Sequence, residues 1–402
     1  MLSGKTIILG VAGGIAVYKA VELLRLLSKA GADVHVIMTR AAQEFVTPLT
    51  FQTLSRNPVH TELFNLISEQ EIGHITLADR ADLVVVAPAT ANIMGKIANG
   101  IADDMLTTTV MASTAPVMLA PAMNVNMYHN PIYRENEERL RHHGYRFVAA
   151  VRGDLACGWE GEGKMQAPEI IFEEVVKALT PPDLAGERIL VTAGPTREEI
   201  DPVRYISNYS SGKMGYAIAR AAWQRGADVI LVSGPTGLPV PWGVENLPVK
   251  SAGEMYDTVM SRVEECSVVI KAAAVADYRP AARVGEKIKK QGESMTLNLV
   301  KNRDILADLG KGRGGRRQVT VGFAAETSEL LANARKKLET KNVDLLVAND
   351  VTEAGAGFSV DTNIVRLLYR SGRVDEPGLL AKGAVANLIL DRIAELLSLD
   401  KH

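Results

Sequence analysis

One pattern constrains the fold of this chain more than any other: short runs of β-branched residues alternate with segments of helical periodicity. In the first half, strand-like runs occur at residues 6–9, 34–38, 83–87 and 117–119, with an amphipathic helix around residues 21–27. The pattern then starts again, with strand-like runs at residues 188–192 and 229–232 and a helix at residues 214–225. Such alternation is typical of parallel sheets covered by helices, so we expect an α/β protein of two doubly wound domains.

The position of the domain boundary follows from length and from a cluster of helix and strand breakers. The chain has 402 residues, more than the roughly 250–300 residues at which single hydrophobic cores stop growing. Gly-Ala-Asp-Val occurs at residues 31–34 and again at 226–229, each time between a helix and a strand. The breakers lie at residues 180–187, so we predict domains over residues 1–186 and 187–402.

Composition excludes several classes of protein. Hydrophobic residues make up 47% and charged residues 23% of the chain, values that suit globular domains and not a disordered tail. The net charge of -2 gives no general attraction for nucleic acid or an anionic membrane, so neither is an expected partner. Cys157 and Cys266 are the only cysteines, and no uncharged run of about 20 apolar residues occurs. We therefore expect a cytoplasmic protein without disulfides.

A glycine-rich turn follows the first predicted strand. Residues 10–16 read Gly-Val-Ala-Gly-Gly-Ile-Ala and lead into the first helix, where backbone N–H groups can bind a phosphate. The spacing is not that of a dinucleotide-binding turn, and the second strand ends in Met38-Thr39-Arg40 without an acid for a ribose hydroxyl. A mononucleotide is thus favoured over a nicotinamide dinucleotide, although a plain tight turn remains an alternative.

Two further segments follow strands in the first half. Residues 88–92 read Pro-Ala-Thr-Ala-Asn, and residues 121–128 read Pro-Ala-Met-Asn-Val-Asn-Met-Tyr. Both lie at predicted carboxyl ends of parallel strands, where open α/β sheets bind ligands. Asn can both donate and accept hydrogen bonds, and Met can pack on a flat ring, so these segments are candidate walls of a heterocycle site.

Together with His74 and the run Cys157-Gly-Trp-Glu-Gly-Glu-Gly-Lys164-Met165, these motifs resemble the flavin-dependent phosphopantothenoylcysteine decarboxylases. The resemblance implies a flavodoxin-like FMN domain with an active-site His74, a substrate-binding Asn124 and a flap that carries an essential Cys157. Many relatives have Arg where this chain has Lys164, and Arg and Lys bind oxyanions differently. The FMN-binding positions implied are Gly13, Gly14, Ile15, Thr39, Pro88, Ala89, Thr90 and Asn92, and the substrate-binding positions include Met123 and Met165.

The expected reaction explains a need for flavin. Loss of CO2 from the cysteine end of 4′-phosphopantothenoylcysteine would leave a carbanion without an electron sink. Oxidation of the thiol by flavin supplies that sink, and reduced flavin later returns the hydride. The resemblance implies that Cys157 donates the proton that completes the product.

The second half contains a different anion-binding turn. Residues 192–198 leave a predicted strand, and Ser210-Ser211-Gly212-Lys213 enters the next helix, which offers hydroxyls, N–H groups and a cation to phosphates. The spacing is not that of a P-loop ATPase. Further polar motifs lie at residues 272–278, 286–290, 302–305 and 322–327 and at Lys337 and Lys341, although lysines spaced i, i+4 usually line a solvated helix face.

These motifs resemble the bacterial phosphopantothenate–cysteine ligases over nearly all of residues 187–402. The resemblance implies a Rossmann-like ligase domain in which the carboxylate of 4′-phosphopantothenate attacks CTP, giving an acyl-cytidylate that free cysteine then attacks. Positive charge would stabilise the crowded phosphates, and Mg2+ is expected with the triphosphate. The implied catalytic residues are Arg204, Asn208 and Lys287, and the implied substrate and CTP positions are Ser210, Ser211, Gly212, Lys213, Ala272, Ala273, Asp277, Asn302, Arg303, Asp304, Ile305, Phe323, Lys337 and Lys341.

The two resemblances fit one pathway, because the product of the ligase is the substrate of the decarboxylase. They imply a bifunctional coenzyme A biosynthesis enzyme that assembles into a large homo-oligomer, a dodecamer built from trimers of the first domain and dimers of the second. Two alternatives remain open at this stage: a nicotinamide oxidoreductase with two Rossmann domains, and a non-catalytic flavin-binding regulator.

Overall fold

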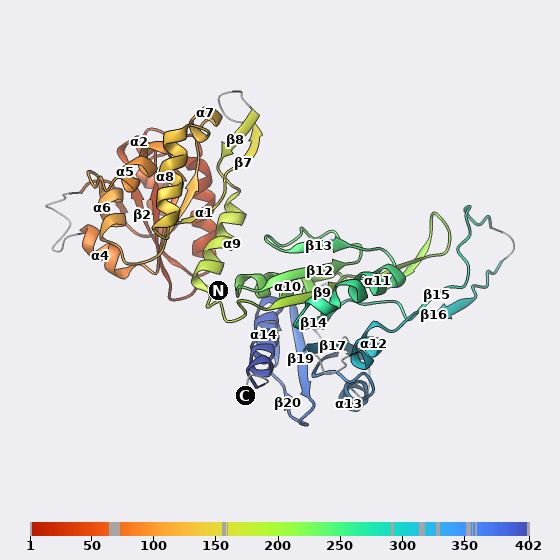
Figure 1. Ribbon diagram of the computed structural model, residues 1–402. Helices are drawn as coiled ribbons and strands as arrows, with labels where there is room; N and C mark the ends of the chain where they lie inside the picture. Colours follow the sequence, from red (N-terminus) through yellow and green to blue (C-terminus); the bar gives the residue numbers. More distant parts are fainter. Residues whose placement is uncertain are drawn as a thin grey trace. The chain divides into compact units, whose positions relative to one another are not determined.

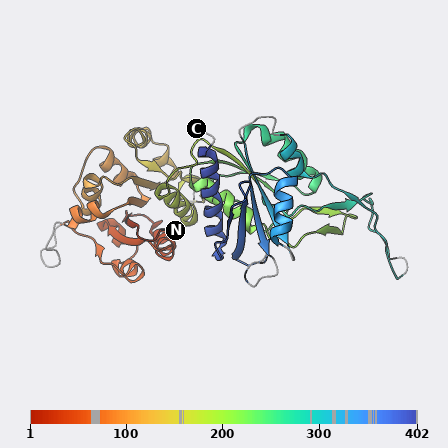
Figure 2. The ribbon, with the colours of Figure 1, turned by 90° about the horizontal axis from the view of Figure 1, so that it is seen from below.

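The computed structural model describes residues 2–63, 73–154, 158, 160–290, 293–312, 318–326, 330–350, 355, 357 and 360–399. The chain forms two compact units, Met1–Thr180 and Pro181–His402. In each unit helices cover both faces of a central sheet (Figure 1, Figure 2). The predicted α/β class with two parallel sheets is thereby confirmed.

The first unit is built on a six-stranded parallel sheet with the order β3-β2-β1-β4-β5-β6. Edge strand β3 has two residues; without it the order is that of flavodoxin-like folds, 2-1-3-4-5 when the strands are renumbered. A separate antiparallel hairpin pairs β7 with β8. The strands are β1 (Thr6–Val11), β2 (Asp33–Met38), β3 (Val59–His60), β4 (Leu83–Ala89), β5 (Val117–Pro121), β6 (Arg146–Phe147), β7 (Val151–Asp154) and β8 (Glu160–Lys164).

Helices on each face of this sheet bury alternate residues of the strands. In α1 the buried side chains include Val17, Ala20, Leu24 and Leu27, a spacing that forms one apolar stripe. This stripe packs with α3 and α9 on one face, while α5 packs with α6 and α8 on the other. The helices are α1 (Val17–Lys29), α2 (Arg40–Gln43), α3 (Pro48–Ser55), α4 (Gly73–Arg80), α5 (Ala91–Ala98), α6 (Met105–Ala112), α7 (Val125–Tyr128), α8 (Pro131–His142) and α9 (Pro168–Leu179).

The second unit contains a larger sheet with the order β13-β12-β9-β14-β17-β18-β19-β20. Its strands from β13 to β18 are parallel, and in chain order they follow the Rossmann order 3-2-1-4-5-6. Strand β19 then pairs antiparallel with β18, β20 and β21. The strands are β9 (Arg188–Ala193), β12 (Asp228–Ser233), β13 (Glu245–Pro248), β14 (Val268–Lys271), β17 (Val319–Glu326), β18 (Leu345–Asp350), β19 (Thr362–Tyr369), β20 (Val374–Asp375) and β21 (Leu379–Ala381).

Two helices cover one face of this sheet and three cover the other. Helices α10 (Lys213–Gln224) and α14 (Lys382–Leu399) pack together over one core. Helices α11 (Ala252–Arg262), α12 (Ile305–Lys311) and α13 (Leu330–Thr340) cover the opposite face. Two antiparallel hairpins project from the carboxyl edge: β10 (Arg197–Glu199) with β11 (Tyr205–Ser207), and β15 (Tyr278–Pro280) with β16 (Leu299–Lys301).

Residues 181–186, which we expected to end the first domain, pack with the second unit. Leu184 is fully buried in the core beneath α10. Arg225, at the end of α10, donates to Asp183 Oδ1 at 2.9 Å and to Asp391 Oδ1 of α14 at 2.7 Å. This buried guanidinium ties the breaker segment to both helices, so the boundary lies near residue 180 and not at 187.

The predicted strands and helices of both halves are present, and most extend one to four residues beyond the predicted range at one or both ends. Among the residues that the structure describes, no helix is long and apolar enough to span a bilayer.

Candidate active sites

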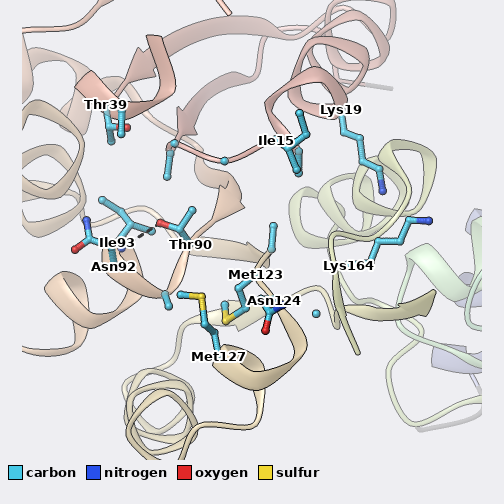
Figure 3. A pocket seen from close by; sticks show the side chains of 18 of the residues that line it. Ile15, Lys19, Thr39, Thr90, Asn92, Ile93, Met123, Asn124, Met127 and Lys164 are labelled. Carbon is cyan, nitrogen blue, oxygen red and sulfur yellow. Dashed lines mark hydrogen bonds between the residues drawn. The ribbon is translucent and has the colours of Figure 1, made fainter. Parts of the chain in front are cut away.

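The first unit contains a cavity of about 770 Å³ at the carboxyl ends of its parallel strands. Strands β1 and β4 are neighbours in the sheet, and from them the chain order runs in opposite directions. Such a switch point opens a crevice between the loops that follow the two strands. The loop after β1 forms one wall, and Met123, Asn124 and Met127 lie on the opposite wall (Figure 3).

The loop after β1 is held close to its neighbours. A Cβ added at Gly13 would lie 2.6 Å from the Ala41 carbonyl carbon and 2.8 Å from its oxygen, so a side chain there would require the backbone of α2 to move. Thr39 caps α2 by accepting from Ala42 N, and Thr90 caps α5 by accepting from Ile93 N. Gly13 and Gly14 of this loop also line the cavity, and N–H groups at such a loop can bind a phosphate.

Six of the eight predicted cofactor positions line the cavity, namely Gly13, Gly14, Ile15, Thr39, Thr90 and Asn92. The other two, Pro88 and Ala89, are buried within β4 and do not line it. Pro88 instead braces the glycine loop, because its carbonyl accepts from Ala12 N at 3.4 Å.

The wall opposite the glycine loop is formed by the N-terminus of α7 and hairpin β7–β8. Asn124 caps α7 by accepting from Asn126 N at 2.8 Å. Met123 N donates to Gly163 O at 2.9 Å, and Gly163 has φ +124 with no room for a Cβ beside Met123 O. The hairpin and the segment that carries Asn124 thus form one wall, and both Met123 and Asn124 line the cavity.

Two lysines lie at the hairpin side of the cavity. Lys19 of α1 donates from Nζ to Met165 O at 2.6 Å, and both Lys19 and Lys164 line the cavity (Figure 3). Burial, followed by the nearby charge of Lys164, lowers the pKa of Lys19. The side chain of Met165 is 1% exposed and belongs to the core beneath α1, so only its backbone serves this region. Sequence reasoning did not identify Lys19.

Two further predicted residues of the first unit, His74 and Cys157, are not found in the described lining of this cavity. His74, in the first turn of α4, does not line the cavity. Its Nδ1 atom is buried and has no hydrogen-bond partner among the residues that the structure describes. Cys157 lies outside the described residues. Of these two groups, only His74 can be placed, and it lies outside the described lining of the cavity.

In the second unit, the switch point lies between β9 and β14. The loops after these strands are joined, because Ala274 N donates to Gly194 O at 3.0 Å. Asn208 donates from Nδ2 to Ala274 O at 2.8 Å, which places this exposed amide over the junction. Gly212, at φ +80, precedes α10, and its N–H donates to Ser210 Oγ. The predicted anion-binding turn thus meets the carboxyl ends of the two central strands.

Asp201 organises the other side of this site. Its fully buried carboxylate accepts from Arg204 at Nε (3.0 Å) and Nη2 (2.6 Å) and from Ile288 N (3.1 Å). Arg204 Nη2 also donates to Ile288 O at 3.0 Å. The bond from Arg204 holds the pKa of Asp201 well below its usual range. One buried acid therefore holds Arg204 beside the segment that carries exposed Lys287.

Sequence reasoning did not single out Asp201 as a site residue, although its i, i+3 spacing to Arg204 was a usable signal.

Several other residues implied by the ligase resemblance lie near the first turn of α12. Asp304 caps this helix and accepts from Lys341 Nζ at 2.6 Å, while Lys337 Nζ donates to Phe323 O at 3.2 Å.

The remaining predicted positions differ in where their side chains point. Asn302 is 8% exposed and donates to Ala276 O at 2.8 Å, so it braces the loop after β14. Arg303 lies over the Tyr256 ring and pairs with Asp257 at 2.6 Å, which turns its guanidinium toward α11. Lys213 Nζ pairs with Asp361 at 2.6 Å. Ile305, the first residue of α12, is buried. Ser211, Ala272 and Ala273 lie in the loops at the switch point, and Asp277 is exposed.

Comparison with known proteins identifies the family. Residues 1–180 match the family model "Flavoprotein", and residues 184–397 match "DNA/pantothenate metabolism flavoprotein C-terminal domain". The chain is 51% identical over 400 residues to the coenzyme A biosynthesis bifunctional protein CoaBC of Bacillus subtilis, covering 98% of each chain. It is 46% identical over 396 residues to the CoaBC protein of Escherichia coli, covering 98% of this chain and 97% of the other.

Among solved structures, the C-terminal domain of a CoaBC protein is 45% identical, with a TM-score of 0.47, and its match covers 54% of this chain and 98% of that one. The full-length relatives match both units in a single alignment. The chain therefore belongs to the family of bifunctional coenzyme A biosynthesis enzymes, in which a phosphopantothenoylcysteine decarboxylase is joined to a phosphopantothenate–cysteine ligase.

Proposed function

We propose that the second unit joins 4′-phosphopantothenate to cysteine with CTP through an acyl-cytidylate, and that the first unit decarboxylates the product to 4′-phosphopantetheine with FMN. The observation that carries this proposal is the full-length identity of 51% to a bifunctional CoaBC protein. Polar side chains at the two switch points support it as well, because Thr39, Thr90 and Asn124 line the cavity of the first unit and Asn208 bonds the loop junction of the second, and such points are the usual ligand position in these folds.

In the ligase reaction, a carboxylate must approach the α-phosphate of CTP although both are negatively charged. Arg204 and Lys287 supply positive charge from two segments that Asp201 holds together. This charge would be placed before reaction, so that it stabilises the crowded phosphates at little reorganisation cost. Asn208 would contact the acyl intermediate from the loop junction through the part of its amide that does not bind Ala274 O.

Mg2+ would enter this site with the triphosphate. In the part of the chain that the structure describes, no group of three or more His, Cys, Asp or Glu side chains is arranged to hold a metal ion. A Mg2+ ion bound mainly by phosphate oxygens and water fits this observation, because Mg2+ retains several waters and needs few protein ligands.

In the decarboxylase site, the residues fit FMN. The cavity volume of about 770 Å³ accommodates a mononucleotide-sized ligand, and Gly13 and Gly14, which have no side chains, line this cavity. FMN, when bound, would supply reversible hydride transfer at the cysteinyl thiol. Asn124 would hold the substrate from the opposite wall, and Lys19 and Lys164 would attract its negative charges. Cys157 would donate a proton to the product.

His74 must reach this cavity from elsewhere, because it does not line the cavity of its own chain. We propose that His74 of one chain completes the cavity of another in the trimer of first units, and that dimers of second units complete a dodecamer. Ile75, the neighbour of His74, is 41% exposed, and Ile15 at the cavity rim is 59% exposed. Contact between copies of the chain would bury such apolar surface.

The test of both activities is a single incubation of the purified protein with 4′-phosphopantothenate, cysteine, CTP and Mg2+, followed by mass spectrometry. We expect CTP-dependent 4′-phosphopantetheine and CO2. Accumulated phosphopantothenoylcysteine would support the ligase and contradict the decarboxylase. No product from folded, FMN-loaded protein would contradict both.

Variants test the assigned residues separately. Lys287→Gln should suppress pyrophosphate release from CTP, whereas Lys289→Gln, a matched control at an exposed lysine two residues away, should not. Asn208→Asp should impair formation or turnover of the acyl-cytidylate. Unchanged pyrophosphate release in both site variants would refute this assignment.

The shared decarboxylase site has its own test. Cys157→Ser and His74→Asn should each be inactive with purified phosphopantothenoylcysteine. If each cavity combines residues from two chains, co-expression of the two variants should restore part of the activity, since some cavities then receive both native residues. Failure to restore activity in confirmed mixed oligomers would show that His74 and Cys157 serve the same chain.

A further inference from the structure

Lys271 lies at the carboxyl end of the central strand β14, between Thr192 of β9 and Gly322 of β17. Strand residues alternate between faces, and Val269, two residues earlier, belongs to the core on the α11 and α12 side. At Gly322, an added Cβ would lie 2.8 Å from Leu306 of α12. The side chain of Lys271 therefore points toward the first turn of α12, at the switch point of the second unit.

Among the described residues, two lysines and two acids act electrostatically on this side chain. They are Lys337 of α13, Lys341 just after α13, Asp304 at the N-cap of α12, and Asp277 in the loop after β14. Lys341 is paired with Asp304 at 2.6 Å, and Lys337 donates to a backbone carbonyl at 3.2 Å. In the part of the chain that the structure describes, no residue accepts a hydrogen bond from the Lys271 amine.

The surroundings of Lys271 disfavour its charge when the site is empty. Burial, followed by the positive charge of Lys337, lowers the pKa of Lys271 from 10.5 to about 8. Lys341 acts in the same direction, while Asp304 and Asp277 oppose it. A ligand oxygen beside the amine would favour the charged form and raise the pKa again.

We infer that Lys271 is a further binding residue of the nucleotide site and donates a hydrogen bond to the nucleoside part of CTP. The inference rests on the proposed CTP-dependent function. The mixture of amines with Asp277 and Asp304 favours the nucleoside part over the phosphates, because carboxylates repel phosphates but accept hydrogen bonds from ribose hydroxyls. The Lys271 amine would add a hydrogen-bond donor to these carboxylate acceptors, and it would donate to a hydroxyl or carbonyl oxygen of the nucleoside.

Isothermal titration calorimetry with CTP and with CMP tests this contact in the full-length protein. Lys271→Met retains most of the side-chain volume and removes the amine, and we expect about 10-fold weaker binding of both nucleotides. Lys336→Met, at an exposed lysine of α13, is the matched control and should bind both as the parent does. Thermal unfolding of each variant verifies that it is folded.

A second measurement uses proton uptake, which a purely structural role would not produce. Because the pKa of Lys271 is lowered to about 8, a fraction of its amines is neutral at pH 8 before binding, so CTP binding should take up less than one proton per site. Titrations in buffers of different ionisation enthalpy measure this number. The uptake should disappear in Lys271→Met and persist in Lys336→Met.

Three results would overturn the inference. They are an unchanged CTP affinity in folded Lys271→Met, a loss of affinity for CTP without any loss for CMP, and no proton uptake by the parent protein at pH 8. The last result needs no variant, so it applies even if Lys271→Met does not fold. A parent protein that binds no CTP would instead refute the proposed function on which the inference rests.

Discussion

The tight packing of the glycine loop in the first unit predicts a specific effect of adding one methyl group. Gly13→Ala would place a Cβ 2.6 Å from the Ala41 carbonyl carbon and 2.8 Å from its oxygen. Contacts below 3.0 Å with backbone cannot be relieved by rotating a side chain, so the loop or α2 must move. Overpacking of this kind costs about 1–3 kcal/mol, which corresponds to about 2–12 °C in the melting temperature of a unit of this size.

The adjacent glycine provides the matched control. A Cβ at Gly14 would meet only Thr90 Cγ2, at 3.7 Å, which is an ordinary van der Waals contact. In flavin-free protein, Gly14→Ala should therefore change stability by less than about 1 kcal/mol, since alanine also restricts the unfolded chain.

The assay is thermal unfolding of the flavin-free protein. The transition that rises on addition of FMN reports on the first unit, because a ligand stabilises the unit that binds it. Gly13→Ala should lower this transition, and it should also weaken FMN binding about 5-fold or more if the displaced loop carries the phosphate site. Equal melting temperatures for the two variants would refute the packing argument.

Three further predictions concern the second unit. Arg225→Met should lower its free energy of unfolding by about 1–3 kcal/mol in chemical denaturation, because the buried guanidinium bonds two segments; Arg335→Met, at an exposed position, should have little effect. In the folded protein the pKa of Lys271 is lowered to about 8, so the unfolded state binds more protons between pH 8 and 10.5. The free energy of unfolding, measured relative to Lys271→Met, should therefore rise with pH in this window by at most about 3 kcal/mol. A difference in free energy that does not change with pH would contradict this. Asp201→Asn should slow acyl-cytidylate formation about 10-fold or more while CTP still binds, because Arg204 loses its ionic partner; unchanged single-turnover kinetics would contradict the positioning role.

Much of the fold could be predicted from local sequence. Buried strands such as β1, β4 and β9 are continuous apolar runs, and the apolar stripe of α1 has an unambiguous helical period. The boundary was placed too late because the breakers at residues 180–187 have no local feature that assigns them to either side. Leu184 and Arg225 decide this by packing between segments distant in sequence.

The site residues divide in the same way. Gly13, Thr39 and Asn124 follow strands, and parallel strands bring such positions to one edge, so their convergence was predictable. Pro88 and Ala89 were predicted in the same segment as Thr90, but they belong to the end of β4 and are buried. A difference of one residue at a strand end decides whether a side chain faces a ligand, and sequence patterns do not define ends that closely.

The sequence by itself determined the two-domain α/β architecture, the family motifs and the edge of each sheet where they gather, because hydrophobic period and turn chemistry are local properties. Only the tertiary structure decided that Asp201 joins Arg204 to the segment of Lys287, that Lys337 and Lys341 come near enough to Lys271 to lower its pKa, and that His74 does not line the cavity of its own chain. The physical reason is that hydrogen bonds, burial and electrostatic shifts depend on distances between segments, and these distances exist only after the sheets have formed.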